Sequence, residues 1–114
     1  MMTFSDAAIE HFTNQVLYNP KLTQIVFDVK KTGCSGWAYE ITGMVESVEV
    51  KGELVLDHTD EDSELRFKAY IAEGAEAFLN GLHVDVQSDG FMTRTVFINP
   101  NEKAVCGCGE SFTI

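Results

Sequence analysis

The sequence predicts an α+β, β-rich fold: a compact, mostly antiparallel, sandwich-like domain with an N-terminal helix and one short later helix. Three observations support this fold class. The chain has 114 residues, which suits a single domain spanning 1–114. Hydrophobic residues make up 45% of it, including 8 Phe, so a core can form without disulfides. Short alternating apolar stretches follow one another along the chain, as is typical of strands that pair with their sequence neighbours.

The first segment carries a helix pattern. Ser5 and Asp6 can cap a helix, because short side-chain oxygens accept hydrogen bonds from the free N–H groups at its start. Asn19 and Pro20 end the pattern, since proline cannot continue a helix. The apolar residues at helical spacing between these signals are Ile9, Phe12 and Val16.

Strands are predicted along most of the remaining chain. Residues 24–30 alternate between apolar and mostly polar side chains and predict a half-buried strand. Residues 73–80 predict a short helix closed by Gly81, and the acidic stretch 57–64 predicts an exposed loop. Further strands or short apolar runs are predicted at 37–42, 45–50, 53–56, 65–71, 82–86 and 93–98.

The charge balance excludes several classes of partner. The chain carries 18 acidic and 8 basic residues, a formal charge of −10, whereas nucleic acid and anionic membranes bind clustered positive charge. The N-terminus lacks the patterns of a secretion signal and of a transit peptide, and no apolar run approaches the roughly 20 residues of a membrane span. We therefore expect a cytoplasmic protein, in which an odd count of 3 cysteines indicates thiolate chemistry rather than disulfides.

The most informative motif is Cys106-Gly107-Cys108-Gly109. Two thiols one residue apart can grip one soft metal ion or one iron of a cluster, and the intervening glycine lets the backbone bend around it. The same spacing disfavours a mutual disulfide, whose geometry is narrowly defined. The surrounding segment 102–114 has few apolar residues, so we expect a mobile tail that bears these two cysteines.

The third cysteine, Cys34, lies between glycines in Gly33-Cys34-Ser35-Gly36, with 71 residues separating it from Cys106. A lone cysteine is often a small buried hydrophobe, so its role as a ligand depends on the fold bringing it to the tail. Three thiolates do not complete a four-cysteine cluster site. The missing ligands can come from a second copy of the chain, from Glu110 or from a small external thiol, and such an open site suits loading and unloading.

Both cysteine motifs resemble those of the A-type iron–sulfur cluster carriers, the HesB-like family. The resemblance rests on residues 32–39, TGCSGWAY, on the ending Asn99-Pro100-Asn101 and on 106–112, CGCGESF, and it extends to the opening 4–8, FSDAA. It implies a β-rich dimer or tetramer that binds iron, [2Fe–2S] or [4Fe–4S] through Cys34, Cys106 and Cys108.

The same resemblance implies the protein's partners. Family members receive a cluster from an upstream scaffold and pass it to apo-proteins, so we expect a carrier and not an enzyme. Glu110 corresponds to an acidic residue that follows the cysteine pair in the family. This chain departs from its relatives in a longer and more acidic segment at 51–66.

Other functions fit the sequence less well. A zinc-binding or thiol-redox module using the same cysteines is the main alternative, but zinc and redox sites favour C-x-x-C spacing. A calcium loop counted from Asp57 lacks the required Gly and Glu. Trp37 is a core residue or a shield for the cluster. The histidines, which we expect at the surface, are His11, His58 and His83.

Overall fold

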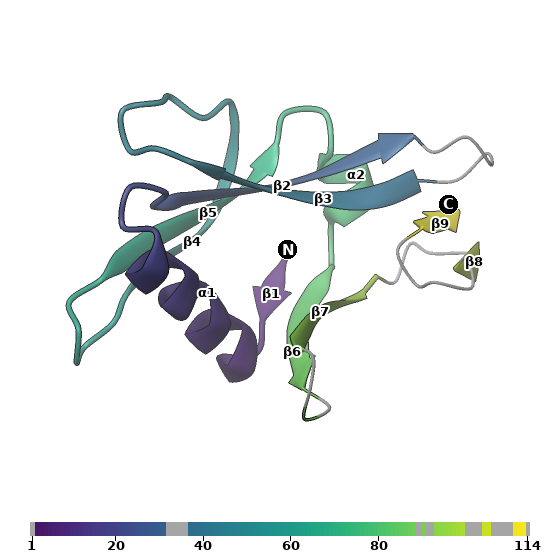
Figure 1. The fold of residues 1–114 in the computed structure, drawn as a ribbon. Coiled ribbons are helices and arrows are strands. Elements are labelled where there is room, and N and C mark those ends of the chain that lie inside the picture. The colour runs from purple at the N-terminus through teal and green to yellow at the C-terminus, as the bar shows by residue number, and fades with distance from the viewer. Residues whose placement is uncertain are drawn as a thin grey trace.

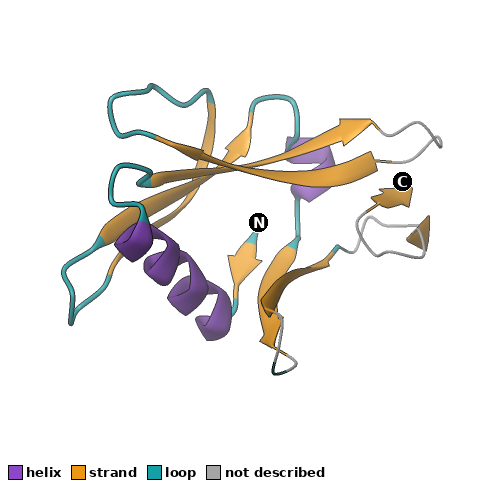
Figure 2. Ribbon diagram, viewed as in Figure 1, coloured by secondary structure: helices purple, strands orange, loops and turns teal. Residues whose placement is uncertain are grey.

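The computed structural model describes residues 2–31, 37–88, 90, 93–99, 104–105 and 111–113. The elements in this part of the chain are, in order, β1 (Thr3–Phe4), α1 (Asp6–Tyr18), β2 (Gln24–Lys31), β3 (Trp37–Met44), β4 (Gly52–Thr59), β5 (Arg66–Ala72), α2 (Glu76–Leu79), β6 (His83–Ser88), β7 (Thr93–Ile98), β8 (Ala104–Val105) and β9 (Ser111–Thr113). This β-rich composition, with one long helix at the start and a short one later, confirms the predicted fold class (Figure 2).

The strands form two sheets (Figure 1). A six-stranded sheet has the order β4-β5-β2-β3-β9-β8, and a three-stranded sheet has the order β1-β6-β7. Helix α1 lies beside the smaller sheet, and together they cover one face of the larger sheet. Most pairings are antiparallel as predicted, but β2 pairs with β5 and β1 pairs with β6 in parallel, each after a long crossover.

Helix α1 begins where the sequence predicted. The Ser5 hydroxyl accepts a hydrogen bond from the Ala8 N–H at 3.1 Å and donates one to the Asp85 carboxylate at 2.6 Å. One side chain therefore caps the helix and ties it to β6. Of the residues at helical spacing, Phe12 and Val16 are buried and Ile9 packs against the core.

The core lies between α1 and the inner face of the larger sheet. Its centre is an aromatic cluster in which Phe12 contacts Phe4, Phe27 and Phe67 with ring centroids 5.7–6.4 Å apart. The contacts of Phe12 with Phe4 and Phe27 are edge-on, and contacts of this kind add about 1 kcal/mol each to the gain from burial. The later helix α2 is shorter than predicted, and Gly81 follows it with a φ of 85°, as the sequence predicted.

Two predictions for the middle of the chain are wrong. Strand β2 is half-buried only in its second half, because residues 24–27 are buried on both faces. Residues 45–50 form turns and loop rather than a strand, and Val50 packs against the core. The Gln24 side-chain amide donates to the carbonyl oxygens of Val45 and Val48, both at 2.7 Å, and these bonds hold the segment against the start of β2.

The acidic loop is shorter than predicted. Strand β4 continues through Asp57, His58 and Thr59, so only residues 60–65 remain outside strands. A bidentate ion pair across the β4–β5 hairpin extends the strand pairing. In it, the Arg66 guanidinium donates to both Asp57 carboxylate oxygens, at 2.6 and 2.9 Å. The sequence also predicted no strand at 3–4 or in the tail. The mobility expected of residues 102–114 stays a prediction.

Candidate functional site

The residues predicted to bind a metal lie outside the described part of the chain. Cys34 belongs to segment 32–36, and Cys106, Cys108 and Glu110 belong to segment 106–110. The structure does describe the strands that flank both segments. These strands fix where both segments begin and end.

Each cysteine segment connects two paired strands. Segment 32–36 joins β2 to β3, and the flanking residues Lys31 and Trp37 are register partners. Segment 106–110 joins β8 to β9, where Val105 pairs with Phe112. A weak signal for this second hairpin is present in the sequence, since β-favouring residues stand on both sides of the Cys-Gly-Cys-Gly motif.

Strands β3 and β9 join the two hairpins. They pair antiparallel, with Trp37 opposite Phe112 and Ala38 opposite Ser111 (Figure 1). Trp37 is three residues after Cys34, and Ser111 is three residues after Cys108. Three residues of chain span at most roughly 11 Å, so both cysteine motifs are tethered closely to one pair of strands.

Aromatic contacts stiffen the base of this arrangement. The Trp37 ring lies 4.5 Å from the Phe78 ring of α2, and the Tyr39 ring stacks on Phe97 of β7 at 4.4 Å. The Asn99 side-chain amide donates to the Phe78 carbonyl oxygen at 2.8 Å and fixes α2 below the strand. Trp37 thus acts as a packing residue, and its predicted role as a cluster shield concerns residues outside the described part.

Positive charge is present beside the first cysteine segment. Lys30 and Lys31 end β2 with exposed side chains, in a chain that has only 8 basic residues. Neighbouring cations favour the thiolate form of cysteine, which is the form that binds metal. The acidic excess lies elsewhere, and one concentration of it is the β4–β5 connection.

The histidines and the acidic loop do not form a second metal site in the described residues, where no group of three potential ligands gathers. His58 lies against the Phe67 ring, and the His83 Nδ1 lies 2.8 Å from the Thr3 hydroxyl oxygen. His11 lies in α1 near Phe12. All three histidines are partly exposed, in keeping with the surface positions expected for them.

The acidic loop uses its carboxylates for its own structure. The Asp60 carboxylate accepts hydrogen bonds from the Ser63 N–H and hydroxyl at 2.9 and 2.6 Å, and these bonds lower the pKa of Asp60. The Arg66 guanidinium lowers the pKa of Asp57 in the same way. Both carboxylates are therefore structural groups of the hairpin, which agrees with the failure of the calcium pattern.

Known proteins resemble this chain over nearly its whole length. It is 30% identical over 113 residues to the iron-sulfur cluster assembly protein SufA of Escherichia coli K12, covering 99% of this chain and 86% of SufA. It is 29% identical to the mitochondrial iron-sulfur cluster assembly 1 homolog of Homo sapiens, covering 99% of this chain and 81% of that protein. No protein-family model matches the sequence.

Solved structures share the fold. The crystal structure of IscA with the [2Fe-2S] cluster superposes with a TM-score of 0.74 at 26% identity, covering 100% of this chain and 98% of that one. The crystal structure of Escherichia coli SufA gives a TM-score of 0.70 at 29% identity, over 99% and 92% of the two chains. In the described residues, none of the helices has the length and apolar character that crossing a membrane requires.

Proposed function

This chain belongs to the A-type iron–sulfur cluster carriers of the HesB-like family, and we propose that it holds its cluster through Cys34, Cys106 and Cys108. The cluster is its cargo, which the protein binds and passes to apo-proteins. One observation carries the assignment of the three ligands to a single site. Strand pairing between β3 and β9 tethers both cysteine motifs to adjacent strands.

The donor set suits this cargo. Cysteine thiolates are the usual ligands of [2Fe–2S] and [4Fe–4S] clusters, and four of them complete a site. Three thiolates from one chain leave a position for Glu110, a small thiol or a second copy. An incomplete site in two loops releases its cargo more readily than a closed one, so the arrangement favours a carrier over a permanent electron-transfer centre.

The first test is anaerobic reconstitution with iron, sulfide and reductant, followed by transfer to an apo-ferredoxin. We expect visible charge-transfer bands that move to the acceptor. Colourless protein with tight stoichiometric zinc would contradict the proposal and favour the alternative zinc module. This experiment also distinguishes iron alone from the two cluster types by their spectra.

The second test removes single ligands. We expect Cys106→Ser and Cys108→Ser to abolish cluster loading, with Cys34→Ser acting in the same direction, while circular dichroism stays unchanged. The matched control is Ser35→Ala, which changes the neighbour of Cys34 and keeps all three thiols. Normal cluster content in any of the cysteine variants would remove that residue from the site.

The assembly and location are part of the same proposal. We propose a homodimer or homotetramer in which the cluster lies between chains, because one chain supplies too few thiolates. A cluster-loaded species that sediments as a monomer without added thiol would contradict this. The upstream scaffold and the acceptor apo-proteins are the expected partners. Cytoplasmic localisation stays a prediction, since the relatives include both bacterial and mitochondrial proteins.

A further inference from the structure

The inner face of β3 is covered by other side chains along the first half of the strand and exposed along the second half. Its first two inward residues are covered, Trp37 by Phe78 and Tyr39 by Phe97. The next inward residue, Ile41, is 39% exposed. An isoleucine on the inner face of a sandwich is normally buried, so the two layers separate beyond Tyr39.

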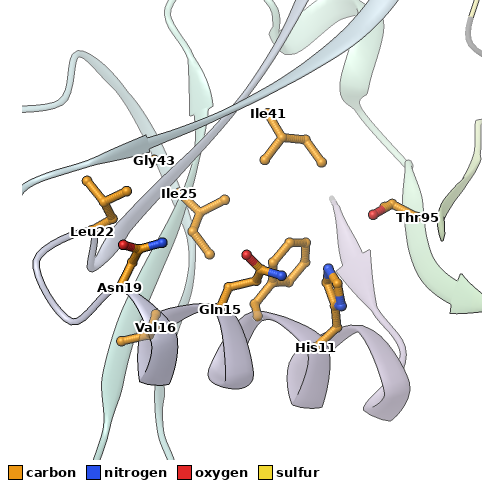
Figure 3. Close-up of a pocket in the computed structure, with 10 residues that line it drawn as sticks. His11, Gln15, Val16, Asn19, Leu22, Ile25, Ile41, Gly43 and Thr95 are labelled. Carbon is orange, nitrogen blue, oxygen red and sulfur yellow. The ribbon is translucent and has the colours of Figure 1, made fainter. Parts of the chain in front are cut away.

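A cavity of about 290 Å³ lies beneath this uncovered half. Its walls come from α1, from the β2–β3 hairpin and from Thr95 of β7, and most of the exposed lining is apolar. In Figure 3, Ile41 extends from β3 toward His11 and Gln15 of α1, with Thr95 across the space. Gly43 leaves the cavity open at its base. The Cβ atom of any other residue at this position would lie 3.2 Å from the Leu22 Cδ1 atom.

The backbone edge of β3 is open above the same cavity. Strand β9 pairs with β3 only at Trp37 and Ala38. Within the part of the chain that the structure describes, residues 40–44 pair with β2 on one side and have no neighbouring strand on the other. An open row of backbone N–H and C=O groups is a template for a further strand.

We propose that residues 40–44 of β3 bind an extended segment of the acceptor apo-protein as an added strand. This inference rests on the proposed carrier function and names the surface that receives the partner. Alternate apolar side chains of the added strand would cover Ile41 and fill the cavity. The intervening side chains would lie on the outer face beside Glu40, where a Lys or Arg pairs best, in agreement with the net charge of −10.

A second copy of this chain fits the same edge poorly. Two β3 strands paired antiparallel about Thr42 would separate their Trp37 residues by ten positions, or about 33 Å. Because Trp37 is three residues from Cys34, such a dimer would place the Cys34 segments of the two copies at opposite ends of the paired strands. An acceptor strand instead begins or ends beside Trp37 and Ala38, at the pairing site that tethers both motifs.

The test uses apo-ferredoxin as the acceptor and the cluster-loaded full chain. In Ile41→Lys, a charge on the inner face of the edge opposes strand addition. We expect normal loading and a second-order transfer rate constant reduced by about tenfold, the effect of one lost apolar anchor. The matched control is Leu54→Lys on edge strand β4, where the leucine is 49% exposed, and it should transfer at the wild-type rate.

Amide hydrogen exchange gives a direct readout. We expect apo-ferredoxin to slow exchange of the amides in 40–44 in the wild type and not in Ile41→Lys. Should Ile41→Lys fail to fold, Glu40→Lys on the exposed outer face replaces it, with an expected two- to threefold loss of transfer rate typical of one surface charge pair. Wild-type transfer by these variants, or unchanged exchange at 40–44, would overturn the inference.

The remaining outcomes separate this inference from the proposed function. If Ile41→Lys lowers the sedimentation mass of the unloaded protein, a second copy occupies the edge and the inference is wrong. If the protein loads and transfers clusters but the edge variants behave as wild type, the carrier function stands and only the docking surface fails. If no cluster loads in the wild type, the proposed function itself is wrong.

Discussion

The two halves of β3 differ in how the sandwich closes beneath them. At the end that leads into the first cysteine segment, Trp37 and Tyr39 stack on aromatic rings of α2 and β7. At the other end, Ile41 and Gly43 border a cavity, and Thr95 faces them from β7. Phe97 and Thr95 lie two residues apart on the same strand, so β7 contributes to both the closed end and the open end.

The two ends of β3 therefore suit different roles. The closed, aromatic end fixes the strands that flank both cysteine segments, as the proposed ligand set from distant parts of the chain requires. An open end exposes apolar surface and strand edge at a cost in stability, and such a cost is typical of binding surfaces.

The closed end should be sensitive to truncation. We expect Phe97→Ala to destabilise the fold by about 2 kcal/mol, somewhat less than for a fully buried Phe, because Phe97 is only partly buried. It also removes the stack on Tyr39. Urea denaturation measures the loss. A decrease in the free energy of unfolding of less than about 0.5 kcal/mol would mean that the closed end is packed no more tightly than the open end.

Helix α1 forms one wall of the cavity at the open end, and the Ser5 side chain holds the start of this helix. Ser5→Ala removes both the cap of α1 and the bond to Asp85. We expect a loss of about 1 kcal/mol, with faster amide exchange in the first turn of α1. Ser5→Asp is the control, because aspartate also caps a helix but would face Asp85. A stable Ser5→Ala variant would show that packing alone holds the wall.

Matched substitutions on one sheet face give the sharpest comparison. Ile41 and Ile71 both project from strands of the larger sheet, but Ile71 is 3% exposed and Ile41 is 39% exposed. We expect Ile71→Val to cost about 1 kcal/mol and Ile41→Val less than about 0.5 kcal/mol. Equal losses, measured by thermal unfolding, would indicate that the open end closes in solution.

The smallest effect is a pH dependence at the α1–β6 contact. The Ser5 hydroxyl lowers the pKa of Asp85 from its ordinary value of 3.8. The folded state therefore gains stability from ionised Asp85 above that value and loses it as the pH falls through the lowered pKa. We expect a small drop in stability below about pH 4 that Asp85→Asn reduces, and urea titrations at several pH values measure it.

Local patterns predicted those elements whose contacts are local. The cap at Ser5, the spacing of Phe12 and Val16 and the stop at Pro20 all lie within one segment, and the helix follows them. Strand β7 likewise has its predicted bounds. Such signals need no knowledge of the rest of the chain.

The errors came from contacts between distant residues. Residues 45–50 have the composition of a strand. The Gln24 side-chain amide instead donates hydrogen bonds to two of their carbonyl oxygens, and the segment forms turns beside β2. The end of β4 has the composition of a loop, but Arg66 holds Asp57 in the ladder. Each partner lies 9 to 24 residues away, beyond the reach of periodicity.

The candidate site divides in the same way. Spacing alone predicted Cys106 and Cys108 as a metal-binding pair, because their relation is local. Nothing local relates Cys34 to them, and the resemblance to a family supplied that link. The physical basis is the pairing of Trp37 with Phe112, which joins positions 75 residues apart. The open half of β3 was not predicted, because the exposure of Ile41 depends on how α1 and β7, which are distant in sequence, pack beneath the strand.

The parallel pairing of β1 with β6 has a consequence for biosynthesis. Ser5 and Asp85 are separated by 80 positions, and a ribosome adding about 5–20 residues per second needs roughly 4–16 s to make that stretch. Throughout this time the first strand of the nascent chain lacks its neighbour. The second cysteine segment is synthesised later still, after β6 and β7. Because β8 and β9 of the larger sheet flank that segment, the sheet and the set of three thiols are completed together, and cargo loading falls to the finished protein.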